Sequence, residues 1–401
     1  MPDDQAAVAT RASLQGFTAD GLAAFNAAFH GLVDEKKLAN VVTLIARHGE
    51  IANLDAYGAM DASDPARGPV QADSIFRIAS MTKPITGAAM MMLWEEGKWA
   101  LDDPVAKHIP AFADLKVRRK DGDLVPQTRP MTMAQLMSHT AGFGRAGEYA
   151  DQGVNLRAGD LQDMIDALAK LPLSFQPGTD WRYGPSVDIQ GYLVEQMSGM
   201  GLDEFFEQRL FAPLGMQDSG FWVDPAKSDR VVRIHKYDDN GVIRAAGTEN
   251  IFNKAKPKFL AGGGGLVSTA QDYWRFAQMI LSGGEAAGRR YLKPETVRLM
   301  HTSVLESGVN VTLYSPDTKG LGFGMDFAIV EDPAAAKTSQ GVQSFYWGGA
   351  FGTWFWIDTV NDMIVIGMIQ NVAGSQTAAG NPAVRELSAE RVYAAMADRR
   401  P

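Results

Sequence analysis

Both ends of the chain carry the apolar patterns of β-strands. Residues 41–45 form a short run of β-branched and apolar side chains, and a turn at 48–50 separates it from a second strand-like stretch. Near the other end, apolar and aromatic runs at 354–357 and 363–369 flank the turn residues 359–362, which is the pattern of a β-hairpin. This distribution predicts one α/β lobe that the two ends of the chain build together.

Helical spacing of apolar residues marks other segments. An amphipathic helix is expected over 20–37, and Thr269 has the position of an N-cap ahead of another helix. Residues 84–96 are apolar on nearly every side, which is typical of a buried helix. The chain is expected to close with a helix over 381–396 that has Pro382 at its start.

The centre of the chain is rich in helical patterns that proline and glycine interrupt. Asp103 followed by Pro104 predicts a helix start there, with the aspartate as N-cap. The whole pattern predicts an α/β (α+β) fold in which a mostly helical lobe is inserted into the α/β lobe. A single domain is expected over 17–398, with 17–79 and 251–398 in the α/β lobe and 80–250 in the helical lobe.

Composition narrows the possible classes of protein. The 401 residues include no cysteine, which excludes disulfides and a thiol nucleophile. A net charge of −9 argues against a general nucleic-acid binder, because such proteins present a basic face. The basic run at 116–120 is expected to be a solvated loop or hairpin tip. The six histidines lack the spacing of metal ligands, so we expect no metal site.

Targeting signals are also not evident in the sequence. The first ten residues hold two aspartates and no basic residue, and no apolar segment follows, so we expect no secretory signal. No stretch approaches the roughly 18–20 apolar residues that span a bilayer. We therefore expect a cytoplasmic protein without a membrane partner, and the oligomeric state is left open.

Ser80 and Lys83 are the first candidates for chemistry. They lie three residues apart, so on a helix their side chains are neighbours, with Cβ atoms about 5–6 Å apart. A serine hydroxyl becomes a good nucleophile when a base takes its proton, and a lysine can do this where burial or nearby positive charge lowers its pKa. The pair begins the apolar helix, whose free N–H groups would stabilise an oxyanion. The structural alternative is a helix cap with a surface lysine.

Two later segments could complete such a site. Tyr183 could act as a general base beside a lysine and return the proton to a leaving group, or it could be a core tyrosine before a turn. Trp347-Gly348-Gly349-Ala350 leads into the late strands, and its glycines would let the backbone approach a ligand closely. The Ala350 N–H could then join the Ser80 N–H in an oxyanion hole, or the segment could be a simple bulge.

Other motifs are given structural roles. His139 is expected to be a structural hydrogen-bonding residue. The glycine run 262–265 is not followed by the Lys-Ser/Thr of a phosphate-binding loop, so we expect it to let the backbone pass close to a catalytic cleft. No Gly-x-Ser-x-Gly occurs, which leaves an α/β-hydrolase nucleophile elbow unsupported.

The three motifs, in this order and spacing, resemble the serine β-lactamase and penicillin-binding-protein superfamily, which uses Ser-x-x-Lys, a Tyr-x-Asn element and Lys-Thr-Gly. Within it, the chain looks most similar to the class C β-lactamase-like serine esterases, the family VIII carboxylesterases. The resemblance runs over about 17–396, with further support from 76–83, 136–142 and 262–269.

This resemblance implies a β-lactamase/transpeptidase-like fold, with an antiparallel sheet flanked by N- and C-terminal helices. It implies that Ser80 is the acyl-enzyme nucleophile and that Lys83 and Tyr183 are the acid–base pair, with no metal or organic cofactor. The N–H groups of Ser80 and Ala350 would form the oxyanion hole, and the substrate would contact Trp347, Gly348 and Gly349.

Two positions depart from the superfamily pattern. Pro185 stands where the Asn of Tyr-x-Asn would hold an acyl amide. Trp347 stands where the Lys of Lys-Thr-Gly would pair with a carboxylate, and it offers an apolar face instead. Both changes favour neutral esters, and the Trp-Gly-Gly form agrees with the esterase branch. Lys337-Thr338-Ser339 is a competing match without the glycine, and it would favour a β-lactamase if it were the third motif.

The sequence therefore predicts a serine carboxylesterase that acts on a small-molecule ester. Short acyl chains are expected, because Trp347 and nearby aromatic residues would narrow the cleft. The alternatives on the same fold are a β-lactamase, a D-amino-acid peptidase and an acyltransferase. A non-catalytic binding protein is a further class, but it would require the loss of an essential group, and Ser80, Lys83 and Tyr183 are all present.

Overall fold

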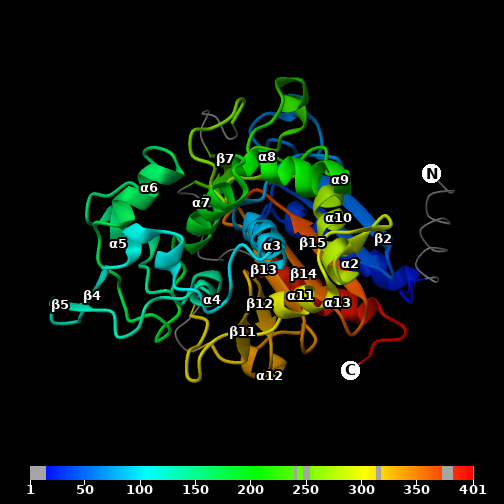
Figure 1. The fold of residues 1–401 in the computed structure, drawn as a ribbon. Helices are drawn as coiled ribbons and strands as arrows, with labels where there is room; N and C mark the ends of the chain where they lie inside the picture. The colour runs from blue at the N-terminus through cyan, green and yellow to red at the C-terminus, as the bar shows by residue number, and fades with distance from the viewer. Residues whose placement is uncertain (1–14, 239–241, 247–252, 313–317, 373–382, 401) are drawn as a thin grey trace.

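A seven-stranded sheet forms the centre of the computed structural model, which describes residues 15–238, 242–246, 253–312, 318–372 and 383–400 (Figure 1). The strand order is β11-β12-β13-β14-β15-β1-β2, and every neighbouring pair is antiparallel. The strands are β1 (Asn40–Arg47), β2 (Glu50–Gly58), β11 (Leu321–Phe323), β12 (Ala328–Val330), β13 (Phe345–Gly348), β14 (Trp354–Asp358) and β15 (Met363–Met368). The pairing of β1 with β15 joins the two ends of the chain in one sheet, as the apolar pattern predicted.

The remaining elements are helices and short hairpins. The helices are α2 (Ala19–Asp34), α3 (Thr82–Glu95), α4 (Met133–Met137), α5 (Ala146–Ala150), α6 (Leu161–Leu168), α7 (Ser186–Ser198), α8 (Leu202–Phe206), α9 (Ala212–Leu214), α10 (Ala270–Leu281), α11 (Pro294–Met300), α12 (Pro333–Ala336) and α13 (Val384–Ala395), with a π-helical turn at Glu207–Phe211. The strand pairs are β3 (Phe76–Arg77) with β8 (Val267–Ser268), β4 (Lys116–Arg118) with β5 (Leu124–Pro126), β6 (His235–Tyr237) with β7 (Ile243–Ala245), and β9 (Glu285–Ala286) with β10 (Arg289–Arg290). Turns of 3₁₀-helix lie at Pro65–Arg67, Ala79–Met81, Val105–Lys107, Pro110–Phe112 and Pro225–Arg230.

Helices cover both faces of the central sheet. Trp354 and Phe355 are consecutive on β14 and therefore point to opposite faces. Trp354 stacks on Phe29 of α2 with the ring centroids 5.7 Å apart, whereas Phe355 lies 4.9 Å from Tyr273 of α10. The C-terminal helix α13 packs beside α2 (Figure 1). These contacts confirm the predicted antiparallel sheet between terminal helices and internal ones.

The helix that carries the candidate nucleophile is buried because of its sequence. Every residue from Thr82 to Leu93 of α3 is buried, which agrees with its apolar pattern on all sides. The short pair β3–β8 leads into the 3₁₀ turn at Ala79–Met81, and α3 follows at once. Ser80 therefore lies at a junction between a strand and a buried helix, as predicted.

Several local expectations can be compared with the structure. Thr269 is the N-cap of α10 and accepts a hydrogen bond from the Asp272 N–H, and the basic run at 116–120 lies on the β4–β5 hairpin, so both predictions are confirmed. The prediction of a helix start at Asp103 is wrong. Only the 3₁₀ turn at Val105–Lys107 follows, because the Asp103 carboxylate does not cap a helix. It accepts hydrogen bonds from the Ala100 N–H and the Lys107 ammonium instead. The last helix begins at Val384, and Pro382 lies outside the described residues.

A buried hydroxyl ties α13 to the sheet and gives a stability prediction. Ser388 Oγ accepts hydrogen bonds from the indole N–H groups of Trp354 and Trp356, each at 3.1 Å, and it is fully buried. Replacing Ser388 with alanine would leave both buried donors unpaired. We expect the S388A free energy of unfolding in urea to fall by about 2–4 kcal/mol.

The matched control is Ser307→Ala, because Ser307 is exposed. This variant should change the free energy of unfolding by no more than about 0.5 kcal/mol. Equal effects of the two substitutions would contradict the role given to Ser388.

Candidate active site

Ser80 and Lys83 are in direct contact at the start of α3. The Lys83 Nζ lies 3.2 Å from the Ser80 Oγ and donates a hydrogen bond to it. Lys83 is buried at 5% exposure, whereas Ser80 is partly exposed. The structure thus brings together the two residues that helical spacing predicted to be neighbours, with the hydroxyl accessible and the amine behind it.

The glycine run 262–265 holds Lys83 in place. The Lys83 Nζ donates a second hydrogen bond, of 2.5 Å, to the Gly263 carbonyl. The Gly263 N–H in turn donates to Asp188 Oδ1 of α7 at 2.7 Å. A Cβ on Gly262 would come within 2.8 Å of the Val187 carbonyl, so only glycine allows this close approach. The expectation that this run passes close to the site is confirmed.

Tyr183 meets Lys83 through its ring and not through its hydroxyl. The Lys83 Nζ lies 4.4 Å from the Tyr183 ring centroid, which is a cation–π contact. The Tyr183 hydroxyl accepts a hydrogen bond of 3.4 Å from Trp347 Nε1. Within the described part of the chain, the Tyr183 hydroxyl makes no hydrogen bond to Ser80 or Lys83. The phenol therefore lies at the site through its ring contact with Lys83.

The end of β13 lies against the residues that directly precede Ser80. A Cβ on Gly349 would come within 2.5 Å of the Ile78 carbonyl, so the absence of a side chain lets this segment lie against the residues just before Ser80. Thr353 Oγ1 donates to the same Ile78 carbonyl at 3.2 Å. In the described residues, neither the Ser80 N–H nor the Ala350 N–H donates a hydrogen bond to a protein acceptor. Both donors remain available for an oxyanion.

A cavity of about 780 Å³ opens in front of these groups. Its walls include the predicted residues Ser80, Lys83, Tyr183 and Ala350. Trp347 does not line it: the indole is 2% exposed and lies behind Tyr183, against Phe323. Trp347 is therefore not placed to offer an apolar face to the substrate, and the expectation that it narrows the cleft loses its basis. Gly348 and Gly349 also lie outside the walls, so their contact with the site is through the backbone path to Ala350.

Sequence reasoning missed several residues that line this cavity. The charged and aromatic ones among them are Arg77, Arg157, Asp188 and Phe351. Arg77 lies within a segment that supported the family resemblance, but no pattern gave it a role. The competing motif Lys337-Thr338-Ser339 is not at the cavity, because Thr338 follows α12 and donates to Glu386 of α13.

Two buried titratable groups lie close to the Ser80–Lys83 pair. His139 is 1% exposed between the rings of Trp181, Tyr183 and Phe323, and burial, followed by the charge of Lys83, holds its pKa well below the usual value. Neither ring nitrogen has a hydrogen-bond partner in the described residues, so the expectation of a hydrogen-bonding histidine is wrong. The reason is that the aromatic rings of Trp181, Tyr183 and Phe323 pack against it. Burial also raises the pKa of Asp326, which accepts from Gln190 Nε2.

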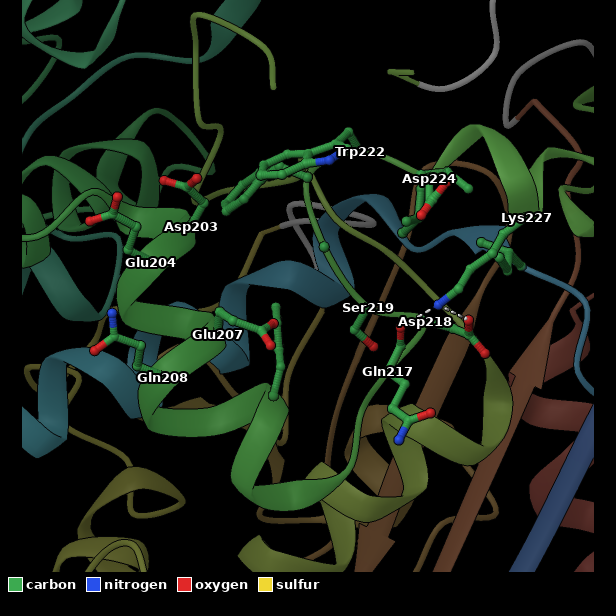
Figure 2. A pocket seen from close by; sticks show the side chains of 16 residues that line it. Asp203, Glu204, Glu207, Gln208, Gln217, Asp218, Ser219, Trp222, Asp224 and Lys227 are labelled. Carbon is green, nitrogen blue, oxygen red and sulfur yellow. Dashed lines mark hydrogen bonds and ion pairs between the residues drawn. The ribbon is translucent and has the colours of Figure 1, made fainter. Parts of the chain in front are cut away.

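A second cavity of about 390 Å³ lies beside β8, and Figure 2 shows its walls. Exposed carboxylates of Glu204 and Glu207 line one side, and Trp222 lines another (Figure 2). Its serine, Ser219, is hydrogen-bonded to Ser268 and to Asp272, and Lys227 is paired with Asp218 at 2.9 Å. Among the described residues, Ser219 has no hydrogen bond to a lysine, whereas Ser80 does, so the larger cavity is the candidate active site.

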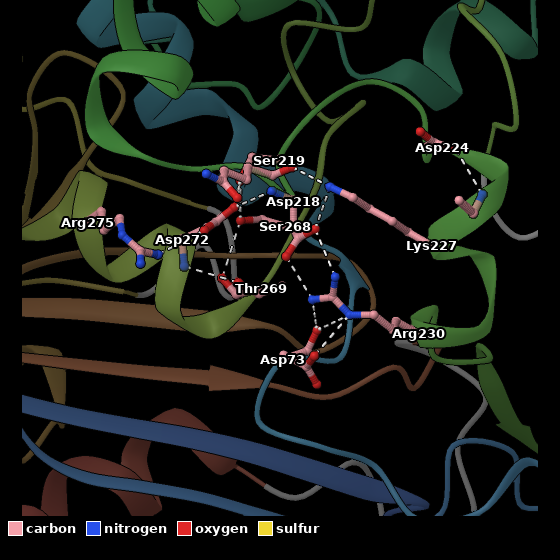
Figure 3. Close-up of polar contacts among 12 residues, drawn as sticks. Asp73, Asp218, Ser219, Asp224, Lys227, Arg230, Ser268, Thr269, Asp272 and Arg275 are labelled. Atoms are coloured by element: carbon pink, nitrogen blue, oxygen red, sulfur yellow. Dashed lines mark hydrogen bonds and ion pairs between the residues drawn. The ribbon is translucent and has the colours of Figure 1, made fainter.

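A polar network next to the second cavity contacts β8, the strand that follows the glycine run (Figure 3). Arg230 binds both carboxylate oxygens of Asp218, at 3.0 and 2.7 Å. Asp272 Oδ2 accepts from the Asp218 N–H at 2.7 Å and from Ser219 Oγ at 3.1 Å. Burial raises the pKa of Asp272, whereas Arg230 and Lys227 outweigh the burial of Asp218 and lower its pKa. The network connects residues 218–219 to Ser268 of β8 and to Asp272 of α10.

Comparison with known proteins identifies a family that matches this chain and proteins that are similar to it. The model of the beta-lactamase family matches residues 25–389. The chain is 34% identical over 382 residues to Protein Rv1367c of Mycobacterium tuberculosis, covering 90% of this chain and 94% of the relative. It is 30% identical over 377 residues to Esterase EstB of Burkholderia gladioli, covering 88% and 90%. A solved structure, "EstCE1, a hydrolase with promiscuous acyltransferase activity", matches with a TM-score of 0.79 and 25% identity over 93% of this chain and 99% of that chain.

The antiparallel sheet, its covering helices and the Ser-x-x-Lys pair define a protein of the β-lactamase/transpeptidase-like fold. The chain belongs to the beta-lactamase family. The resemblance that the three motifs indicated is thereby confirmed. In the described residues, no helix has the length and apolar character to cross a membrane, and no three His, Asp or Glu side chains are grouped as a metal site.

Proposed function

We propose that this chain is a serine carboxylesterase that cleaves carboxylic esters through an acyl-enzyme on Ser80. The contact between the Ser80 hydroxyl and the buried Lys83 amine, 3.2 Å apart at the mouth of a 780 Å³ cavity, carries the proposal. Similarity to an esterase of Burkholderia gladioli supports it. The substrate is a small-molecule ester, and no step needs a metal or an organic cofactor.

In the acylation step, the Ser80 Oγ attacks the ester carbonyl carbon while its proton passes to the Lys83 amine. The carbonyl oxygen becomes an oxyanion, which the N–H groups of Ser80 and Ala350 stabilise. The bond between the carbonyl carbon and the alcohol oxygen then breaks, and the alcohol leaves with the proton that Lys83 or Tyr183 returns. In deacylation, the same pair takes a proton from water while the water oxygen attacks the acyl carbon. The bond between the acyl carbon and the Ser80 Oγ then breaks, the proton returns to the Ser80 oxygen, and the acid leaves.

Tyr183 has a positional requirement in this mechanism. Its ring already faces Lys83, but its hydroxyl is bound by Trp347. For proton transfer the hydroxyl must come within hydrogen-bond distance of the leaving group, and it can keep the Trp347 contact because it still has its own proton to donate. Catalytic hydrogen bonds often tighten only when substrate is bound, so this arrangement is compatible with a role in proton transfer.

Covalent labelling tests the proposal directly. A fluorophosphonate probe should phosphonylate the Ser80 Oγ with loss of fluoride, and peptide mass spectrometry should find the adduct on the peptide that contains Ser80. The protein should also hydrolyse p-nitrophenyl acetate or butyrate. Labelling at a different serine, with ester turnover retained, would assign the nucleophile elsewhere.

Acyl transfer to an alcohol is the second candidate function. The cavity has room for an acyl group and an acceptor alcohol, and EstCE1 is described as having promiscuous acyltransferase activity. β-Lactam or D-amino-acid peptide cleavage would use the same acylation step. Turnover of nitrocefin, and ester formation with added alcohol, measured beside ester hydrolysis would rank these activities. A much higher kcat/KM for nitrocefin would replace the esterase assignment.

A further inference from the structure

The candidate catalytic cavity carries more positive charge than the proposed reaction uses. Apart from Lys83, which accepts a proton in the proposed reaction, its lining side chains include two cations, Arg77 and Arg157, against one carboxylate, Asp188. The chain as a whole has a net charge of −9. A cationic cleft with low-dielectric walls focuses the field and attracts anions. The charge of the cavity therefore points to a ligand with the opposite sign.

The two arginines of the cavity are in different situations. Arg157 is paired with Asp188 at 3.3 Å, and its side chain is 57% exposed. The Arg77 guanidinium makes no ion pair in the described residues, and its contact is with the ring of Phe351, 5.8 Å from the centroid. Burial alone lowers the pKa of Arg77, with no charged neighbour contributing. A guanidinium that is partly removed from water without a carboxylate partner gains most from an incoming anion.

Arg77 is held in a fixed position relative to the nucleophile. The buried amide of Gln370 accepts from the Arg77 N–H at 3.2 Å and donates to the Arg77 carbonyl at 3.0 Å. Arg77 precedes Ser80 by three residues, which span at most roughly 11 Å of chain. Phe351 follows Ala350 directly. The guanidinium therefore lies at the side of the cavity where the two oxyanion donors are found.

We propose that Arg77 determines specificity by binding a carboxylate of the ester substrate, so that preferred substrates carry this group within roughly 10 Å of the scissile ester. The inference rests on the proposed esterase function and names its substrate class. It revises the expectation of neutral esters drawn from Pro185 and Trp347. The ammonium that the superfamily pattern has at position 347 is missing, but Arg77 supplies a cation from β3 instead.

Two matched pairs of substrates test the proposal. The first pair is the mono-p-nitrophenyl ester of adipic acid and its methyl ester, which differ by a carboxylate in the acyl half. The second is 4-acetoxybenzoate and its methyl ester, which differ by a carboxylate in the alcohol half. In at least one pair, Arg77→Gln should lower kcat/KM for the anionic member by about tenfold to a hundredfold and leave the neutral member within about threefold. The pair that responds identifies the half of the substrate that Arg77 binds.

Two further variants separate charge from structure. Arg77→Lys keeps the charge but cannot bind a carboxylate in the bidentate geometry of a guanidinium. Its loss of kcat/KM on the anionic member should therefore be intermediate. Arg298→Gln removes the same charge from an exposed position on α11 outside the cavity, and it should leave both members of each pair unchanged. Retained turnover of the neutral esters shows that each variant is folded.

The outcomes distinguish this inference from the proposed function. Equal changes on the anionic and neutral members in both pairs would overturn the role of Arg77, as would a wild-type protein that cleaves only the neutral esters. If the wild-type protein cleaves none of the four esters, the esterase assignment itself fails. Equal losses of selectivity in Arg77→Gln and Arg298→Gln would assign the effect to net charge and not to the cavity.

Discussion

Replacing Ser80 with alanine should lower kcat/KM for p-nitrophenyl butyrate by about 10⁴-fold or more. The reason is that the Ser80 Oγ is the atom that forms the acyl bond, and no neighbouring hydroxyl shares the contact with Lys83 in the described residues. The loss should appear in kcat, since the cavity walls that bind the ester are unchanged. Steady-state kinetics of the purified variant, with the spontaneous hydrolysis rate subtracted, measure the effect.

Ser219→Ala is the matched control for this substitution. Ser219 lines the second cavity, where its hydroxyl bonds to Ser268 and Asp272. The control should retain activity within about threefold. An S80A protein that stays active while S219A is inactive would move the reaction to the second cavity. The S80A variant should unfold at the wild-type temperature, because its hydroxyl supports no buried partner other than Lys83.

Replacing Lys83 with alanine should reduce kcat by about 10³-fold, within the range that general acid–base groups contribute. Lys83→Arg should be impaired to a similar degree, although it keeps the positive charge. An arginine side chain is not deprotonated in proteins and cannot accept the proton of Ser80. Pre-steady-state measurement of p-nitrophenol release would place the loss in acylation, because Lys83 is needed before the first product leaves.

Lys98→Ala provides the control at the other end of the same helix. Lys98 is exposed just beyond α3, and its loss should leave kcat and KM unchanged. Wild-type rates in Lys83→Arg would show that the site needs a charge at this position and not a proton acceptor. The mechanism would then require Tyr183 to act as the base without help.

The catalytic pair could be predicted because its geometry is local. Ser80 and Lys83 are neighbours in any helix that contains both, and the apolar sequence after them indicates that this helix is buried. Gly349 was predicted to let the backbone approach a ligand, but its close neighbour in the structure is the Ile78 carbonyl, from a distant part of the chain. Sequence patterns were sufficient to predict a contact where both of its residues lie in one short segment.

The residues that were misjudged depend on contacts between distant segments. Trp347 was expected at the cavity wall, but Phe323 of β11 and Tyr183 cover its ring, and the sequence does not indicate which distant side chains meet it. His139 was expected to form hydrogen bonds, but its neighbours contribute aromatic faces. The significance of Arg77 depends on having Phe351 beside it and no carboxylate partner among the described residues, which only the tertiary structure shows.

The glycine run, the end of β13 and α3 also determine when this site can come into existence during biosynthesis. A ribosome-bound chain that has emerged only as far as residue 200 contains Ser80, Lys83 and Tyr183, yet it lacks the carbonyl of Gly263 and the N–H of Ala350. Hydrolytic competence would be acquired only when the last strands have been translated. Prematurely terminated products would therefore be inert towards the esters of the cell that makes them.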